Sequence, residues 1–483
     1  MNIATATIYQ LKEALDKKEI TAVELVQFYL DRISQHDHEV HAFLEVFENV
    51  IHQAKAIDLA RSKGEDLGPL AGIPIAVKDN ILIQGKIASA GSKILENHMA
   101  TYDATGIERL RQAGAIFIGR TNCDEFAMGS STENSAYGPS KNPWDTGRVP
   151  GGSSGGSAAA LAAGFATVAL GTDTGGSVRQ PASLCGTIGL KPTYGRLSRY
   201  GLIALASSLD QLGIFARTVE DAALLLEVMQ GDDPKDATCN PDSDLVVPEL
   251  IDKDIKGLRI GLPKEYFKQG LDKEVEKKVR EAVNFLQGQG AEIIEISLPH
   301  AKFSLAAYYI IMPCEASSNL ARYDGIRYGL SVEAADLDQI YKQSRGQGFG
   351  DETKRRIMLG TYALSSGYYD AYYKRALQVR TLIRQDFDNA FDQVDCILTP
   401  VSPTTAWKIG EKCNDPLTMY LSDIYTISVN LAALPGMSVP CGFIDGLPVG
   451  FQLIGRPFDE LTMFRIAQNY QSQHDWQILD PFV

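Results

Sequence analysis

The sequence has few residues of the kinds that form disulfides or bind metal ions. Its seven cysteines are scattered over 483 residues and form no C-x-x-C pair, which argues against a secreted disulfide framework and favours a reducing cytosol. Among seven histidines the only tight group is His36, His38 and His41, which has no cysteine nearby and is typical of a solvated surface patch. We therefore expect no bound metal and a cytoplasmic protein.

The sequence also lacks the features expected of an exported, membrane-spanning or nucleic-acid-binding protein. The N-terminal stretch MNIATATIYQLKEAL has neither a basic segment nor an apolar core, so we expect no signal peptide, and no apolar run approaches the length of a membrane span. The formal net charge is −14 and the pI about 5.1, which argues against a nucleic-acid-binding surface on this chain alone. Nucleic acid held by a partner is compatible with this charge.

The chain does contain an alternation of helical and strand-like segments. The first sixty residues have a helical pattern, with a capping box predicted at Thr21 and Glu24. Short apolar runs follow at 71–79 and 113–122. From residue 149 a glycine loop, an alanine-rich helix, an apolar run and a second glycine loop succeed one another. This alternation predicts an α/β layer structure.

The second half of the chain continues the pattern. It predicts strands at 258–263, 291–299 and 394–403, a helix at 272–290, a helical stretch over about 301–390, and a hairpin at 436–455 that turns at Asp445-Gly446. The segment LVVPELIDKDIKG (245–257) is the best candidate for a linker. The chain length favours two or three domains, but strands on both sides of this segment are equally compatible with one sheet.

Two serine-bearing glycine loops, VPGGSSGGSAAA (149–160) and GTDTGGSVRQP (171–181), are the most distinctive local feature. They are compatible with binding a phosphate, with holding a reacting carbonyl, or with plain turns. Neither contains the lysine of a phosphate-binding motif, and GTDTGG lacks the dinucleotide-binding spacing. GGSSGG matches a nucleophile elbow at Ser153 and Ser154, although a glycine–serine string does so almost automatically.

Serine chemistry also needs a residue that accepts the proton of the hydroxyl group. No histidine occurs between His98 and His300, and His474 lies in a polar tail that is typical of a surface. Lys78, at the end of the apolar run 71–79, is the alternative: either it reaches solvent, or it is buried and acts as a base. Moving its pKa from about 10.4 to near 7 requires about 4 kcal/mol, which burial can supply.

Taken together, KDN after an apolar run, GGSSGGSAAA and GTDTGGSVRQP resemble the amidase signature family, with Lys78, Ser153 and Ser177 spaced 75 and 24 residues apart. Longer strings, among them GRTNCDEFAMGSSTENSAYGPSKNPWD, narrow the resemblance to the glutaminase subunits of aspartyl/glutamyl-tRNA amidotransferases over essentially the whole chain. One departure is Ile214, where that family usually has proline.

The resemblance implies an α/β amidase signature fold, a central mixed, twisted β-sheet covered by helices on both faces. It also implies a single domain over 1–483, with an N-terminal helical segment at about 1–65 and a signature core at about 66–230.

The resemblance also implies roles for individual residues. Ser177 is the expected nucleophile, Ser153 the bridging serine after a cis Gly152–Ser153 peptide, and Lys78 the base. The expected oxyanion hole consists of the N–H groups of Thr174, Gly175 and Gly176. The expected glutamine-binding residues are Tyr308, Arg356 and Asp423, with Tyr309 and Arg355 as alternatives one residue away.

The implied activity is hydrolysis of glutamine to supply ammonia, with no cofactor or metal bound by this chain. The ammonia would serve a tRNA-binding kinase/amidotransferase partner, which uses ATP and Mg²⁺ to amidate Glu-tRNA(Gln), with Asp-tRNA(Asn) left open as a second substrate. A small third subunit would complete the complex, tRNA would be held mainly by the partner, and no membrane is involved. The alternatives are a stand-alone amidase on another small amide and a non-catalytic glycine-loop protein that binds an anion or nucleotide.

Overall fold

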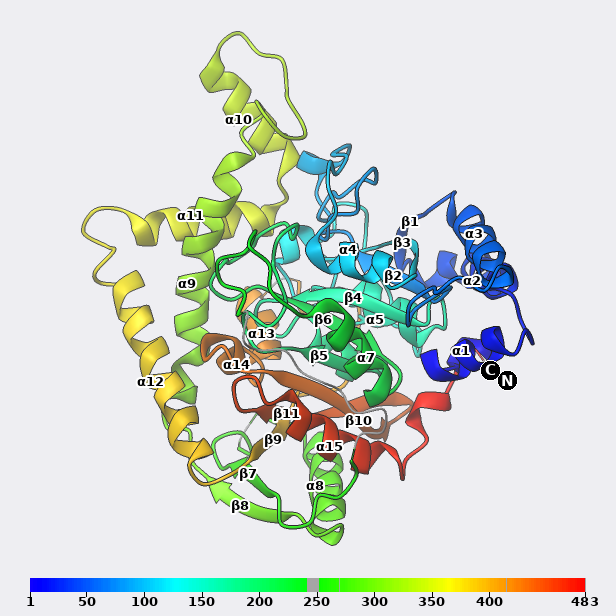
Figure 1. The fold of residues 1–483 in the computed structure, drawn as a ribbon. Coiled ribbons are helices and arrows are strands. Elements are labelled where there is room, and N and C mark those ends of the chain that lie inside the picture. Colours follow the sequence, from blue (N-terminus) through cyan, green and yellow to red (C-terminus); the bar gives the residue numbers. More distant parts are fainter. Residues whose placement is uncertain (241–251, 269, 414, 483) are drawn as a thin grey trace.

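The structure, a computed structural model, describes residues 1–240, 252–268, 270–413 and 415–482. Its centre is a mixed, eleven-stranded β-sheet (Figure 1). In spatial order the strands are β1 (Phe43–Val46), β3 (Ile116–Thr121), β2 (Pro74–Lys78), β4 (Val168–Asp173), β6 (Gln211–Ala216), β5 (Ile188–Lys191), β10 (Gly436–Ile444), β11 (Leu447–Gly455), β9 (Cys396–Pro400), β7 (Arg259–Pro263) and β8 (Glu292–Ile296). Strands β3, β2 and β4 run parallel, as do β9, β7 and β8, and the other neighbouring pairs are antiparallel.

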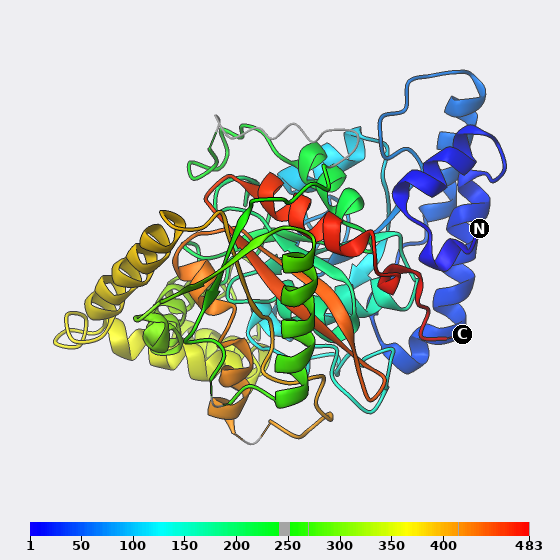
Figure 2. The ribbon, with the colours of Figure 1, turned by 90° about the horizontal axis from the view of Figure 1, so that it is seen from below.

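Helices cover both faces of this sheet (Figures 1 and 2). The helix bounds are α1 Ile8–Asp16, α2 Ala22–Val40, α3 Val50–Ser62, α4 Thr105–Gln112, α5 Gly155–Ala162, α6 Arg179–Cys185, α7 Val219–Met229, α8 Lys273–Gly288, α9 Ser304–Asn319, α10 Leu337–Gly348, α11 Asp351–Leu364, α12 Tyr373–Phe391, α13 Pro416–Tyr420, α14 Ile427–Leu431 and α15 Glu460–Gln471. Helices α5 and α6 pack against each other and against the central strands, whereas α7, α8 and α15 form a second packed group. Helices α11 and α12 both pack on α9 and extend to one side of the molecule (Figure 1).

Most of the predicted elements are confirmed, because their apolar runs are long enough to define a strand. The runs at 71–79 and 113–122 contain β2 and β3, and the run between the glycine loops contains β4. The predicted hairpin is β10–β11, whose turn residues Asp445 and Gly446 have φ values of 50° and 79°, as a two-residue turn requires. The N-terminal helical segment at about 1–65 contains α1, α2 and α3, and also the short strand β1.

The N-terminal helices begin where the sequence indicated. At the start of α2 the Thr21 hydroxyl accepts a hydrogen bond from the Glu24 N–H at 3.1 Å. The Glu24 carboxylate in turn accepts one from the Thr21 N–H at 2.8 Å. This reciprocal pair is the predicted capping box.

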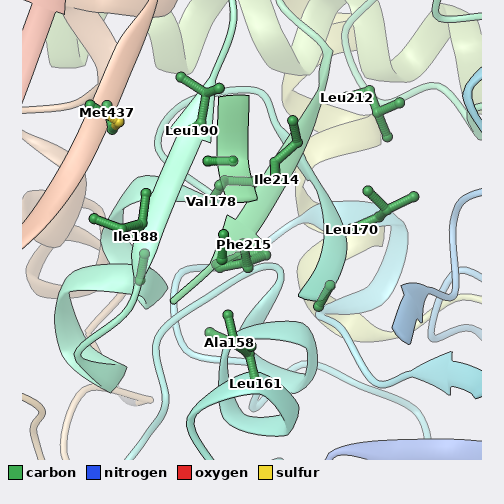
Figure 3. Close-up of a cluster of buried hydrophobic side chains, with 14 of the residues drawn as sticks. Ala158, Leu161, Leu170, Val178, Ile188, Leu190, Leu212, Ile214, Phe215 and Met437 are labelled. Carbon is green, nitrogen blue, oxygen red and sulfur yellow. The ribbon is translucent and has the colours of Figure 1, made fainter. Parts of the chain in front are cut away.

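A cluster of buried hydrophobic side chains lies where α5 meets the central strands (Figure 3). Phe215 and Ile214 of β6 lie between Leu170 of β4 and Leu190 of β5, and all four side chains are buried. Every residue of α5 is buried, because its glycines and alanines let the helix backbone approach its neighbours closely. A Cβ on Gly156, for example, would clash with the Asn122 carbonyl oxygen.

The candidate linker at 245–257 falls largely on residues outside those the structure describes. The single sheet contains strands from both sides of it, since β7, β8 and β9 extend the sheet that β1 to β6 begin. None of the helices in the described ranges is long and apolar enough to cross a membrane.

Candidate active site

Lys78 is the last residue of β2 and is fully buried, so it does not reach solvent. Its Nζ donates hydrogen bonds to the hydroxyls of Ser153 (2.8 Å), Ser154 (2.9 Å) and Thr172 (2.9 Å). Burial lowers the pKa of Lys78 to about 8, against the opposing effect of nearby acidic groups. The structure therefore contains a buried amine that can release its proton near neutral pH and that touches the predicted bridging serine.

The first glycine loop places two serines on this amine. The Gly152–Ser153 peptide is cis, as expected, and the Gly152 N–H donates to Gln180 Oε1 at 3.0 Å. Ser154, the second serine of the elbow pattern, also contacts Lys78, and its hydroxyl lies 2.9 Å from Nζ. Ser154 Oγ also donates to the Thr172 carbonyl at 3.1 Å, which ties the loop to β4.

Ser177 lies in the second glycine loop, directly after β4, and is 8% exposed. Its carbonyl accepts a hydrogen bond from the Ser154 N–H at 3.2 Å, so the two loops are joined through their backbones. In the described part of the chain, no side-chain hydrogen bond connects Ser177 Oγ with Ser153. The structure thus brings the three predicted residues together. Lys78 and Ser153 are hydrogen-bonded, whereas the described structure contains no hydrogen bond between the side chains of Ser153 and Ser177.

A buried ion pair that the sequence reasoning missed holds the second loop. Asp173 accepts hydrogen bonds from the Gly176 and Val178 N–H groups and from the Arg179 side chain. Burial alone would raise the pKa of Asp173, but the Arg179 guanidinium beside it lowers this pKa well below its usual range. Arg179 also donates to Asn430 Oδ1 and Gln452 Oε1, so residues near the end of the chain fix the loop.

The second glycine loop supplies backbone N–H donors for an oxyanion, but the N–H of Gly176 is not one of them. The Gly176 N–H was expected to be free for an oxyanion, but it donates to Asp173 Oδ1 at 2.9 Å because that carboxylate lies beneath the turn. Among the described residues, the N–H groups of Thr174, Gly175 and Ser177 have no acceptor. Glycine is required at the centre of the turn, because a Cβ on Gly175 would lie 2.7 Å from the Tyr308 ring.

The three predicted glutamine-binding residues come from separate elements around this loop. Tyr308 on α9 lies directly against Gly175, and burial raises the pKa of its hydroxyl above the usual range. Asp423 lies between α13 and α14, accepts a hydrogen bond from Ser130 Oγ, and has its pKa raised to about 7 by burial. Arg356 on α11 is 4% exposed, whereas the Arg355 side chain is 46% exposed. Burial therefore distinguishes Arg356 from its neighbour.

Aromatic and acidic side chains orient Arg356. Its guanidinium lies 5.1 Å and 5.0 Å from the ring centres of Tyr309 and Tyr420, which stack on each other. Its Nε donates to Glu352 Oε1 at 2.7 Å. Arg356, Glu352 and Tyr420 line a cavity of about 230 Å³. Its Nη1 also donates to Met312 Sδ at 3.7 Å. A planar guanidinium can bind a carboxylate through two parallel N–H groups.

Comparison with known proteins agrees with this geometry. Residues 24–464 match the Amidase family. The A subunit of glutamyl-tRNA(Gln) amidotransferase from Carboxydothermus hydrogenoformans is 57% identical over 477 residues, 98% of each chain, and that from Chloroflexus aggregans is 57% identical over 479 residues, again 98% of each chain. The crystal structure of the same kind of subunit from Thermotoga maritima is similar with a TM-score of 0.82 and 45% identity, covering 98% of this chain and 96% of that one. With the buried lysine, the paired serines and the glycine loops of the signature in place, this chain belongs to the Amidase family.

Proposed function

We propose that this chain is the glutaminase subunit of a glutamyl-tRNA(Gln) amidotransferase. The contact between Lys78 Nζ and Ser153 Oγ carries the proposal, because it provides a buried base for serine chemistry without histidine. The names of the relatives, which cover the chain almost end to end, support a role in amide transfer to tRNA-bound glutamate. Glutamine as the source of the nitrogen rests on the predicted site residues Tyr308, Arg356 and Asp423.

In the proposed mechanism, neutral Lys78 takes a proton from Ser153 while Ser153 takes one from Ser177. Ser177 Oγ attacks the carboxamide carbon of glutamine, and backbone N–H groups of the second loop stabilise the oxyanion. Removing one such donor typically costs about 3–4 kcal/mol of transition-state stabilisation. The relayed proton leaves with the nitrogen as ammonia, and water then hydrolyses the glutamyl ester to glutamate and restores Ser177.

Glutamine itself is held by its two charged groups, which are both attached to the α-carbon. Arg356 binds the α-carboxylate with its planar fork, Asp423 accepts from the α-ammonium group, and Tyr308 closes the site over Gly175. A zwitterion removed from water needs both partners, because an unpaired buried charge is expensive. A simple amide needs neither of them.

The partners follow from the same proposal. A tRNA-binding partner uses ATP and Mg²⁺ to activate the misacylated tRNA and receives the ammonia, and a small third subunit completes a cytoplasmic complex. This chain needs no metal or cofactor of its own, and its net charge of −14 agrees with tRNA being held by the partner.

A glutaminase assay of the purified full chain, alone and with its partner subunits, tests the proposal. We expect release of glutamate and ammonia from glutamine, and a loss of about 10³-fold or more in Ser177→Ala with the fold retained. Because Lys78, Ser153 and Ser177 serve one relay, double variants should lose little more than single ones. Strictly additive losses, or a Ser177→Ala chain that still forms an acyl-enzyme at the wild-type rate, would refute this assignment.

A further inference from the structure

Asp124 is a fully buried carboxylate that the relay does not use, although it lies against it. It follows β3, and its carboxyl group is enclosed by two glycines. A Cβ on Gly129 would clash with Asp124 Cγ, and a Cβ on Gly152 would clash with Asp124 Oδ2. Only glycine at both positions allows the carboxylate to sit directly on the backbone next to Ser153.

The same carboxylate fixes the loop of residues 129–134. Asp124 Oδ2 accepts a hydrogen bond from the Thr132 N–H at 2.9 Å, and Oδ1 accepts one from the Asn134 N–H at 3.0 Å. The backbone N–H of Asp124 donates to the Ser153 carbonyl at 3.2 Å. A carboxylate that accepts two backbone N–H groups in a buried place sets the position of the segment it binds.

This loop connects the two halves of the site. At one end Thr132 Oγ1 donates to the Gly151 carbonyl at 2.8 Å, beside the bridging serine. At the other end Ser130 Oγ donates to Asp423, and the Ser130 carbonyl accepts from Gln180 at 2.9 Å. The loop therefore touches the residue proposed to bind the α-ammonium group and the peptide that presents Ser153.

We propose that Asp124 is a positioning residue that holds the 129–134 loop against the Gly152–Ser153 peptide and so couples the glutamine site to the proton relay. This inference rests on the proposed glutaminase function. Asp124 makes no contact with substrate in this proposal. It acts through the positions of Ser153 and Ser130 and through its charge on Lys78.

Asp124 also acts on Lys78 by its charge. The acidic groups that face Lys78 are Cys123, Asp124, Asp173 and Asp210, and each raises the pKa of the lysine. Asp173 is paired with Arg179, whereas Asp124 and Asp210 have no cationic partner within hydrogen-bonding distance in the described part of the chain. The titratable groups that interact with Asp124 are Lys78, Cys123, Glu133, Cys413 and Asp423. Burial raises the pKa of Asp124 to about 6. Above that pH its negative charge holds the Lys78 proton more tightly.

Asp124→Asn is the informative variant, because it keeps the shape but has one acceptor where the carboxylate has two, and its amide faces a backbone N–H. We expect the kcat for glutamine to fall at least tenfold and the KM to rise. We also expect the acid limb of the pH–rate profile to move to lower pH, because a protonated Lys78 loses a stabilising charge. Loss of packing alone would not move the acid limb of the pH–rate profile.

Asp221→Asn is the control, since Asp221 is another buried aspartate that accepts a backbone N–H, from Ile8 at 3.0 Å. We expect this variant to leave kcat, KM and the acid limb unchanged.

Ser130→Ala tests the other end of the loop even if Asp124→Asn does not fold, and we expect a several-fold higher KM for glutamine with an unchanged rate on a simple amide. An Asp124→Asn chain with wild-type kcat and an unmoved acid limb, or a Ser130→Ala chain with wild-type KM, would overturn the coupling role. Both results leave the proposed function standing if the wild-type chain hydrolyses glutamine and Lys78→Ala does not. A wild-type chain without that activity, alone and with its partners, would refute the function itself.

Discussion

Lys78 illustrates how one buried residue can replace histidine. Its amine is surrounded by three hydroxyl groups and has no carboxylate within hydrogen-bonding distance in the described structure. Desolvation therefore outweighs the more distant negative charges, and the pKa of Lys78 falls to about 8. The base form becomes abundant just above neutral pH, where a lysine in water would remain protonated.

Glutamine hydrolysis should therefore rise with pH along an acid limb centred near 8, since protonated Lys78 accepts no proton from Ser153. Lys78→Arg should lose about 10²–10⁴-fold at every pH, because a guanidinium stays protonated and supplies no base. A pH–rate profile of both chains checks this. A wild-type profile that is flat between pH 6 and 9 would contradict the role of Lys78.

Asp423 should separate glutamine from simpler amides. Asp423→Ala removes the acceptor for the α-ammonium group, so we expect a strong rise in KM for glutamine and little change on an amide that lacks an α-amino group. Steady-state kinetics on the two substrates measure the difference. Equal losses on both would assign Asp423 to the support of the loop through Ser130 instead.

Sequence reasoning identified the residues that lie inside compact motifs and missed those that the fold recruits from afar. Lys78, Ser153 and Ser177 stand in glycine-rich or apolar strings that can be recognised locally. Arg179 stands in the same string, but its partners Asn430 and Gln452 are more than 240 residues away, and no local pattern indicates them. The engaged N–H of Gly176 was missed for a related reason, because it depends on the rotamer of Asp173.

Secondary-structure elements were predictable in proportion to their length and patterning. The strands β2, β3, β7 and β9 and the hairpin β10–β11 lie in mainly apolar runs between turn residues. The strands β1 and β5 have only four residues each, and β6 begins with glutamine, so tertiary packing rather than periodicity defines them. Ile214, the departure from the family pattern, lies in β6 with its side chain fully buried.

The β10–β11 turn offers a stability test. Gly446 has a φ of 79°, and a Cβ there would meet no described atom within 4 Å, so Gly446→Ala introduces only backbone strain, about 1–2 kcal/mol of lost stability. Gly288→Ala, in α8 and equally free of neighbours, should instead stabilise by about 0.5–1 kcal/mol. Denaturant unfolding of the two variants and the wild type compares them. A Gly446→Ala chain as stable as the wild type would contradict the left-handed turn.

At the scale of the molecule, we expect a stable complex. The proposed function requires that ammonia pass directly to an ATP-using, tRNA-binding partner, so co-expression with that partner and the small third subunit should shift this chain to a larger species on size exclusion. Mixing with an unrelated soluble protein serves as the control. A chain that stays monomeric and has full glutaminase activity would favour a stand-alone amidase.

The order of strands also affects when the active site can form during synthesis on the ribosome. The centre of the sheet joins β5 to β10, and Arg179 is held by Asn430 and Gln452, so the second glycine loop lacks its supports until nearly the whole chain has been made. At about 5–20 residues per second, translation reaches Ser177 about 14–55 s before Gln452. A nascent chain that already carries Lys78, Ser153 and Ser177 is therefore expected to leave cellular glutamine untouched until its final hairpin has emerged.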